Sequence, residues 1–143
     1  MKTYPHCFGC GADNPQGLQL KPGRTNDGSW ESVFIPKESH CGWPGVVHGG
    51  ILATALDEIC GYVVFGEGLS AVTTGMSVSF KQAAAPGERL TVRARPVRVT
   101  RRLVDTAGEI LRPDGSVVAA CEARFLVLSE NQRRTMGIPE SGQ

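Results

Sequence analysis

The sequence predicts a single α+β domain in which an antiparallel β-sheet wraps around one long central helix. Three observations predict this arrangement. An apolar segment runs from Val46 to about Phe65 with only Asp57 and Glu58 charged, and its length and Ala/Leu content suit a helix. A hairpin pattern precedes this segment, and four strand-like segments follow it. Because the helix is apolar nearly all round, we expect other structure to enclose it.

The chain has 143 residues and a formal net charge of +1, which suits one domain over 1–143. We expect a cysteine-containing extension at 1–26 and a loose polar tail at 129–143. The balanced charge predicts no bulk attraction to nucleic acid or to a membrane, and no apolar run approaches the roughly 20 residues that span a bilayer. The odd number of cysteines, five, and the lack of a signal-peptide pattern at the start favour the reducing cytoplasm.

The extension contains a CxxC step, Cys7–Cys10, which is flanked by His6, and His40 and Cys41 lie further along. These residue types are zinc ligands, but no second CxxC or HxxxH step completes a ligand set. We therefore predict that this step binds no metal. We interpret it as a compact turn that packs its thiols and Phe8 against the body of the protein.

Strand patterns lie on both sides of the central segment. Before it, Leu18–Leu20 and Trp30–Ile35 are strand candidates, and Asn26-Asp27-Gly28 is a hairpin signal. The segment from Lys37 to Gly45 is predicted to be a loop. After it come four strand candidates that are separated by turn residues: 72–80, 90–96, 103–111 and 117–127. In all but 103–111, most residues at every second position are apolar.

The start of the central helix offers a chemical site. Two glycines, Gly49 and Gly50, follow His48, and glycine lets backbone or ligand approach closely. The first N–H groups of a helix have no intrahelical partner and carry the positive end of the dipole, so a carbonyl oxygen placed there would be polarised. Asp57, about two turns later, is a candidate base, because a carboxylate in an apolar helix is costly to bury. A buried helix with a tight N-terminal turn and a solvated acid pair is the alternative.

These residues resemble the PaaI-like group of hotdog-fold acyl-CoA thioesterases, in which His-Gly-Gly is followed by an acid nine positions after the His. The segment Gly42–Gly50 is the most specific part, and the similarity extends from Cys7–Gly11 and Asn14–Leu18 to Arg124–Leu128. The resemblance implies a hotdog fold and hydrolysis of an acyl-CoA to a free acid and coenzyme A without metal or redox cofactor. It also implies a homodimer or a dimer of dimers (homotetramer) whose sheets pair edge to edge.

The resemblance also implies roles for single residues. Asp57 would act as general base or nucleophile, the Gly49 N–H would polarise the thioester carbonyl, and Thr73 would hold water or substrate. For His48 we favour orientation of the loop by hydrogen bonds over a role as base. Arg binds phosphate groups such as those of coenzyme A, although a solvated strand face is the alternative for the arginines. The substrate-binding candidates are Val47, Gly50, Thr74, Gly75, Arg101 and Arg102.

Two positions depart from the pattern of the resembling family. Many relatives place Asn or Gln six residues before the His, where this chain has Gly42, so that contact is missing or is supplied by another group such as His40. Some relatives place Thr four residues after the acid, where this chain has Gly61. Glu58 is turned about 100° around the helix from Asp57 and is expected to make a structural contact or to face solvent.

The spacing of Gly49 and Asp57 bears on the assembly. They are eight residues apart, which corresponds to about 12 Å along one helix. A base works within about 3 Å of the group it serves, or through one water, so we expect each site to be shared between two chains. A non-catalytic acyl-CoA-binding or sensing module on the same fold is the main alternative. A hydratase is a weaker one, since no Asp is followed five residues later by His.

Overall fold

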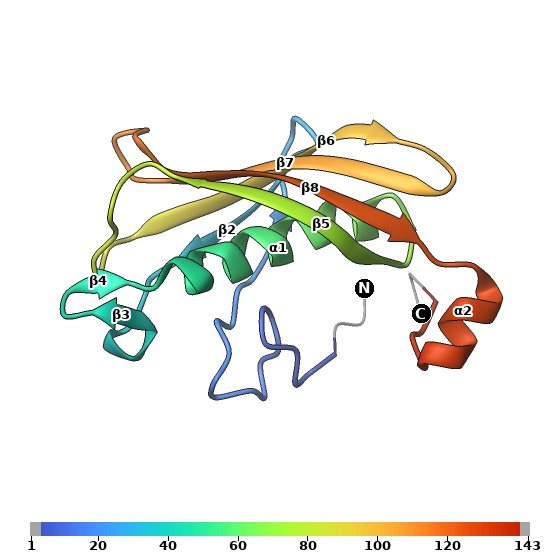
Figure 1. Ribbon diagram of the computed structural model, residues 1–143, viewed down its shortest axis with the longest axis horizontal. Coiled ribbons are helices and arrows are strands. Elements are labelled where there is room, and N and C mark those ends of the chain that lie inside the picture. The colour runs from blue at the N-terminus through green and yellow to red at the C-terminus, as the bar shows by residue number, and fades with distance from the viewer. Residues whose placement is uncertain (1–3, 141–143) are drawn as a thin grey trace.

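The computed structural model describes residues 4–140. One helix, α1 (Gly49–Gly66), lies across one face of a six-stranded antiparallel sheet (Figure 1). The strand order is β1-β2-β6-β7-β8-β5, which leaves β5 at an edge. The strands are β1 (Gly23–Arg24), β2 (Trp30–Phe34), β5 (Ala71–Phe80), β6 (Leu90–Val99), β7 (Leu103–Leu111) and β8 (Val117–Val127).

The core lies between α1 and the sheet. Leu56, Ile59 and Val63, which follow helical spacing, are almost completely buried. Alternate residues are buried along β7, in β6 as far as Ala94 and in β8 from Ala119 to Phe125, which places one face of these strands against the helix. The predicted α+β arrangement of one antiparallel sheet and one long helix is therefore confirmed.

The chain encloses α1 incompletely. By length and composition alone this helix is apolar enough to cross a membrane, a property that the core helix of a globular domain also has. Only 44% of the helix Gly49–Gly66 is buried within the described chain. Phe65 is 43% exposed, and Asp57 is half-buried. The sequence predicts that other structure encloses such an apolar helix. Because the described chain covers it only in part, some of its surface is left for another element or another chain to cover.

The N-terminal segment, from Tyr4 to about Pro22, crosses the face of α1 that points away from the sheet (Figure 1). Leu18 and Leu20 are buried in the core, but their N–H groups donate to Phe8 O (2.8 Å) and Gly9 O (2.9 Å). The predicted strand over Leu18–Leu20 is therefore wrong. The two buried leucines anchor a folded segment, and the backbone of this stretch does not pair with a strand.

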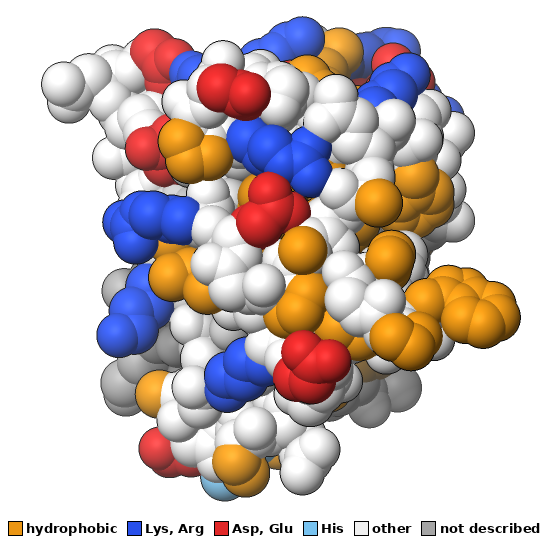
Figure 2. Space-filling model, turned by 90° about the vertical axis from the view of Figure 1, so that its left-hand side faces the viewer, with side chains coloured by type: hydrophobic (Ala, Val, Ile, Leu, Met, Phe, Trp, Pro, Cys, Tyr) orange, Lys and Arg blue, Asp and Glu red, His pale blue; other side chains and the backbone are white. Residues whose placement is uncertain are grey.

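Two further segments differ from the sequence prediction. The expected loop from Lys37 to Gly45 contains a 3₁₀ helix, η1 (Glu38–His40), and leads into a small sheet of β3 (Cys41–Trp43) and β4 (Val46–Val47). Figure 2 shows the end of the molecule where this small sheet lies, with hydrophobic side chains exposed on its surface. Trp43 is the most exposed large hydrophobic residue of the described chain, at 76%.

The polar tail forms a short helix, α2 (Glu130–Met136), where the sequence predicts a loose end. A capping box explains its start, because Ser129 accepts a hydrogen bond from Gln132 N and the Gln132 side chain accepts one from Ser129 N. Gly137 ends it with a left-handed backbone (φ 67°). Residues 1–3 of the predicted extension and 141–143 of the predicted tail lie outside the described part of the chain.

Candidate active site

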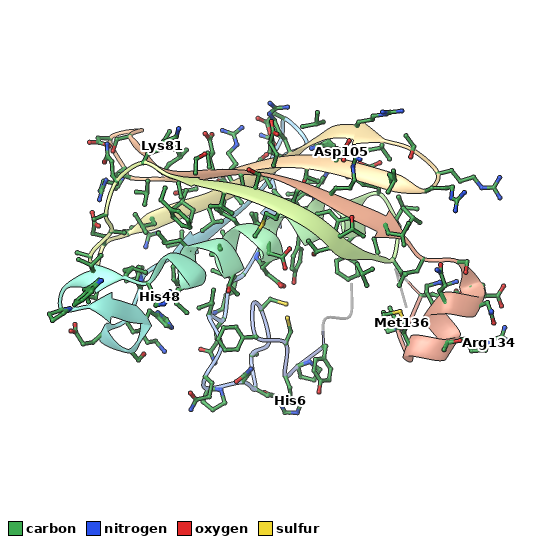
Figure 3. The ribbon with its side chains drawn as sticks, in the orientation of Figure 1. His6, His48, Lys81, Asp105, Arg134 and Met136 are labelled. Carbon is green, nitrogen blue, oxygen red and sulfur yellow. The ribbon has the colours of Figure 1, made fainter. Side chains whose placement is uncertain are left out.

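The start of α1 has one unpaired backbone donor. His48 is the N-cap: its Nδ1 accepts a hydrogen bond from Gly50 N (2.8 Å), and its carbonyl accepts from Ile51 N (3.0 Å) and Leu52 N (3.3 Å). Figure 3 labels His48 where α1 begins. Within residues 4–140, the Gly49 N–H donates to no acceptor. It therefore offers the positive end of the helix to an incoming oxygen.

The position of the His48 ring explains why this chain has Gly at position 42, where many relatives have Asn or Gln. A Cβ atom built on Gly42 would lie 3.0 Å from Cδ2 of the His48 ring, so the imidazole occupies the space that a side chain at position 42 would need. His40, the suggested replacement for the missing amide, is only 7% exposed, and its Nδ1 accepts from Lys37 N (3.0 Å). Burial and the nearby Lys37 charge lower the pKa of His40, which keeps the imidazole neutral for this bond. His40 therefore braces the loop, and its carbonyl accepts from His48 N (2.8 Å).

Asp57 and Thr73 come together from different elements. The Thr73 hydroxyl on β5 donates to Asp57 Oδ1 on α1 at 2.8 Å. A β-bulge between Thr73 and Gly75 shifts the register of β5 against β8, and the Thr74 hydroxyl donates to Arg124 O (3.1 Å). The fold therefore places a hydroxyl donor directly on the candidate base, at the edge of the sheet.

The neighbouring acid points elsewhere. Both carboxylate oxygens of Glu58 lie within 3.8 Å of Cys7 Sγ in the N-terminal segment. The expectation that Glu58 makes a structural contact, and that Asp57 and Glu58 face different surroundings, is confirmed.

The substrate-binding candidates divide into three groups. Gly50, Thr74 and Gly75 are exposed close to the residues described above. Val47 is only 4% exposed because its side chain packs in the core, and its role in substrate binding stays a prediction. Arg101 and Arg102 occupy the exposed turn between β6 and β7, and β8 lies between β7 and β5. The fold of one chain does not bring these two arginines to Asp57, and their role in binding the nucleotide stays a prediction.

Sequence reasoning missed Phe80 at the end of β5. Its ring lies over Gly49, since a Cβ atom built on Gly49 would be 3.4 Å from Phe80 Cε1 and Cζ. The Phe80 side chain is 54% exposed, so it forms an apolar wall beside the free N–H group. The only signal in the sequence was an apolar residue at the end of a strand whose alternate positions are small.

Residues 44–119 match the family model of the thioesterase superfamily, a region that contains His48, Gly49, Asp57 and Thr73. The chain belongs to the thioesterase superfamily. The predicted hotdog fold and the resemblance to PaaI-like hotdog thioesterases are thereby confirmed.

Three similar proteins illustrate this membership. A hypothetical thioesterase protein of Streptococcus pneumoniae TIGR4, whose structure contains coenzyme A, is 25% identical, with a TM-score of 0.72 over 77% of this chain and 86% of that one. A phenylacetic acid degradation-related protein of Ralstonia eutropha JMP134 is 30% identical, with a TM-score of 0.69 over 77% of this chain and 86% of that one. An uncharacterized protein of Schizosaccharomyces pombe is 32% identical over 99 residues, which are 66% of this chain. This match spans only 57% of the yeast protein.

The cap formed by His48 leads to a prediction about stability. His48→Ala is expected to lower the free energy of unfolding by about 1 kcal/mol, because Gly50 N–H loses its acceptor. His48→Asn should keep most of that stability, since Asn is a preferred N-cap residue. Urea denaturation measures both. If His48→Asn kept its stability but lost as much turnover as a variant that lacks the Asp57 carboxylate, His48 would take part in the reaction as well as capping α1.

Proposed function

We propose that this protein hydrolyses acyl-CoA thioesters to a free acid and coenzyme A. The observation that carries the proposal is that α1 presents two groups. One is the unpaired N–H of Gly49, and the other is the carboxylate of Asp57, which the Thr73 hydroxyl holds in place. Membership of the thioesterase superfamily supports the reaction class, and the coenzyme A in the similar streptococcal structure supports the substrate class.

The Gly49 N–H would donate to the carbonyl oxygen of the thioester. Its hydrogen bond strengthens as negative charge develops on that oxygen, so it stabilises the tetrahedral intermediate more than the bound substrate. The Phe80 ring beside Gly49 restricts water around this bond. Collapse of the intermediate breaks the C–S bond, and coenzyme A leaves as its thiolate.

Asp57 would supply the attacking group. As general base it takes a proton from a water whose oxygen then bonds to the carbonyl carbon; as nucleophile its own oxygen forms that bond, and water later hydrolyses the anhydride. The hydrogen bond from Thr73 occupies Oδ1 and orients the carboxylate, which leaves Oδ2 for the reaction in either route. Both routes give the same products.

The geometry favours a site made by two chains. Gly49 and Asp57 lie on one helix, about 12 Å apart along its axis, so they cannot both serve one carbonyl within a chain. The open edge of β5 and the half-buried surface of α1 offer a place for a second copy. We therefore propose a homodimer, alone or paired into a dimer of dimers, in which the start of each α1 faces Asp57 of the other chain.

The direct test is release of free thiol from a panel of acyl-CoAs that covers short, long and aromatic acyl groups. Turnover of at least one of them at a rate well above that of Asp57→Asn is expected. If the protein bound acyl-CoAs but turned over none of them, the non-catalytic binding module would be the better description.

The contact between Thr73 and Asp57 leads to a further prediction. Thr73→Ala is expected to lower kcat by roughly tenfold or more with little change in KM, because a hydrogen bond to a charged group contributes about 1.5–3 kcal/mol. Thr73→Ser keeps the hydroxyl and should restore most of the rate. Equal kinetics for Thr73→Ala and wild type would show that this hydrogen bond plays no part in the reaction.

A further inference from the structure

The N-terminal segment brings two thiols against the central helix. Cys7 Sγ lies 3.8 Å from Glu58 Oε1 and 3.7 Å from Oε2. Together Cys7, Cys10 and Glu58 offer one ligand atom each, and all three atoms lie within 4.8 Å of one another. Glu58 is on α1, and all three side chains are partly buried.

The turn between the cysteines is shaped to admit the carboxylate. Gly9 is buried, and a Cβ atom built on it would lie 2.3 Å from Glu58 Oε2 and 2.5 Å from Glu58 Cγ. Any larger residue at position 9 would therefore push Glu58 out of the CxxC turn. The turn itself is closed by the hydrogen bond from Gly11 N to Cys7 O (2.9 Å), and a Cβ atom on Gly11 would meet the backbone of Cys7 at 2.5 Å.

We propose that Cys7, Cys10 and Glu58 form a zinc site, with the thiolates and one carboxylate oxygen as ligands and water in the fourth position. Zinc bonds of about 2.3 Å to sulfur and 2.1 Å to oxygen, at a tetrahedral angle, place a sulfur and an oxygen ligand roughly 3.6 Å apart. The separations between Cys7 Sγ and the two Glu58 oxygens are 3.7 and 3.8 Å, so these two ligands need little movement, and Cys10 Sγ lies within 4.8 Å of both partners. Thiolate ligands select zinc over magnesium or calcium.

This proposal revises the prediction that the CxxC step binds no metal. The ligands suggested by the sequence do not complete the cluster: the His6 ring packs edge-on against Tyr4, on the outer side of the segment in Figure 3. His40 accepts a bond from Lys37 N, and Cys41 lies in β3. The third ligand comes from a residue 51 positions beyond Cys7, which only the fold brings close.

The site would fasten the N-terminal segment to α1. The segment's contacts with the rest of the protein include the buried leucines, Leu18 and Leu20, and the hydrogen bond from Lys21 N to Ser32 Oγ (3.0 Å), whereas its backbone hydrogen bonds lie within the segment. A metal that binds the folded chain but not the unfolded one adds to stability, and its removal should lower Tm. Because Glu58 adjoins Asp57, the metal would also limit rotation of α1 beside the proposed catalytic carboxylate.

Metal content is the first test. Protein purified without a histidine tag and without added metal should contain about one zinc per chain by elemental analysis. Cys7→Ser and Cys10→Ser should reduce it to traces, whereas Cys41→Ser, a matched substitution of a half-buried cysteine outside the cluster, should retain it. Zinc content in Cys7→Ser equal to that of wild type would overturn the proposal, because the metal would then sit elsewhere.

A second test uses cobalt in place of zinc and begins with the wild-type protein, so its first result does not depend on whether any variant folds. Reduced, metal-free wild-type protein titrated with Co²⁺ should develop thiolate-to-cobalt charge-transfer absorption that saturates at about one equivalent. Glu58→Gln should bind Co²⁺ at least about tenfold more weakly, since removal of even an outer partner of a metal ligand costs 10- to 100-fold. If fully reduced protein gave no such absorption, or Glu58→Gln bound Co²⁺ as tightly as wild type, this ligand set would be wrong.

Discussion

Replacing Asp57 with alanine is expected to lower kcat by about a hundredfold or more while the protein stays folded and still binds acyl-CoA. The reason is that Asp57 is the carboxylate that Thr73 orients on the exposed side of α1, whereas Glu58 points into the CxxC turn. Steady-state thiol release gives the rate, and calorimetric titration with a slowly hydrolysed acyl-CoA analogue shows that binding persists.

The adjacent acid provides the discriminating comparison. Near wild-type kcat for Asp57→Ala, combined with a large loss for Glu58→Gln, would mean that the wrong carboxylate has been assigned. Asp57→Asn separates shape from charge, because it keeps the size of the side chain and an oxygen that can accept from Thr73. It should be as inactive as Asp57→Ala if the carboxylate acts as base or nucleophile.

Mixing two inactive variants, Asp57→Ala and Gly49→Val, is expected to restore about a quarter of wild-type activity if each site is shared between two chains. Random exchange of subunits makes about half of the dimers mixed, and each mixed dimer carries one intact site out of two. Gly49→Val should be inactive alone because a branched side chain at the free N–H fills the gap beside Phe80 and blocks the carbonyl oxygen.

The outcome depends on proof that subunits exchange. Mass spectrometry of isotopically labelled parents can show mixed dimers directly, and circular dichroism can show that both parents are folded. No recovery of activity under those conditions would mean that each site is built within one chain. Recovery well above a quarter would mean that one parent had kept activity of its own.

The sequence by itself determined the features that depend on local periodicity. The alternation of apolar and polar residues in 90–96 and 117–127 predicts which face of these strands is buried, because only one orientation removes the apolar residues from water. The length and composition of the apolar segment predict a helix at α1. The sequence also placed Gly49 and Asp57 on one helix, since their separation is set by helix geometry alone. Short segments were less well determined: Leu18–Leu20 has strand-like alternation, but its buried leucines anchor a folded segment.

Only the tertiary structure decided the contacts between residues far apart in the chain. The bond from Thr73 to Asp57 depends on the place of β5 at the sheet edge and on its bulge, neither of which has a signature in composition. The contact of the Phe80 ring with Gly49 and the contact of the Glu58 carboxylate with Cys7 Sγ likewise depend on the tertiary structure. Periodicity specifies which side of an element turns inward, but the partner it meets there depends on strand order and register, which the whole core sets together.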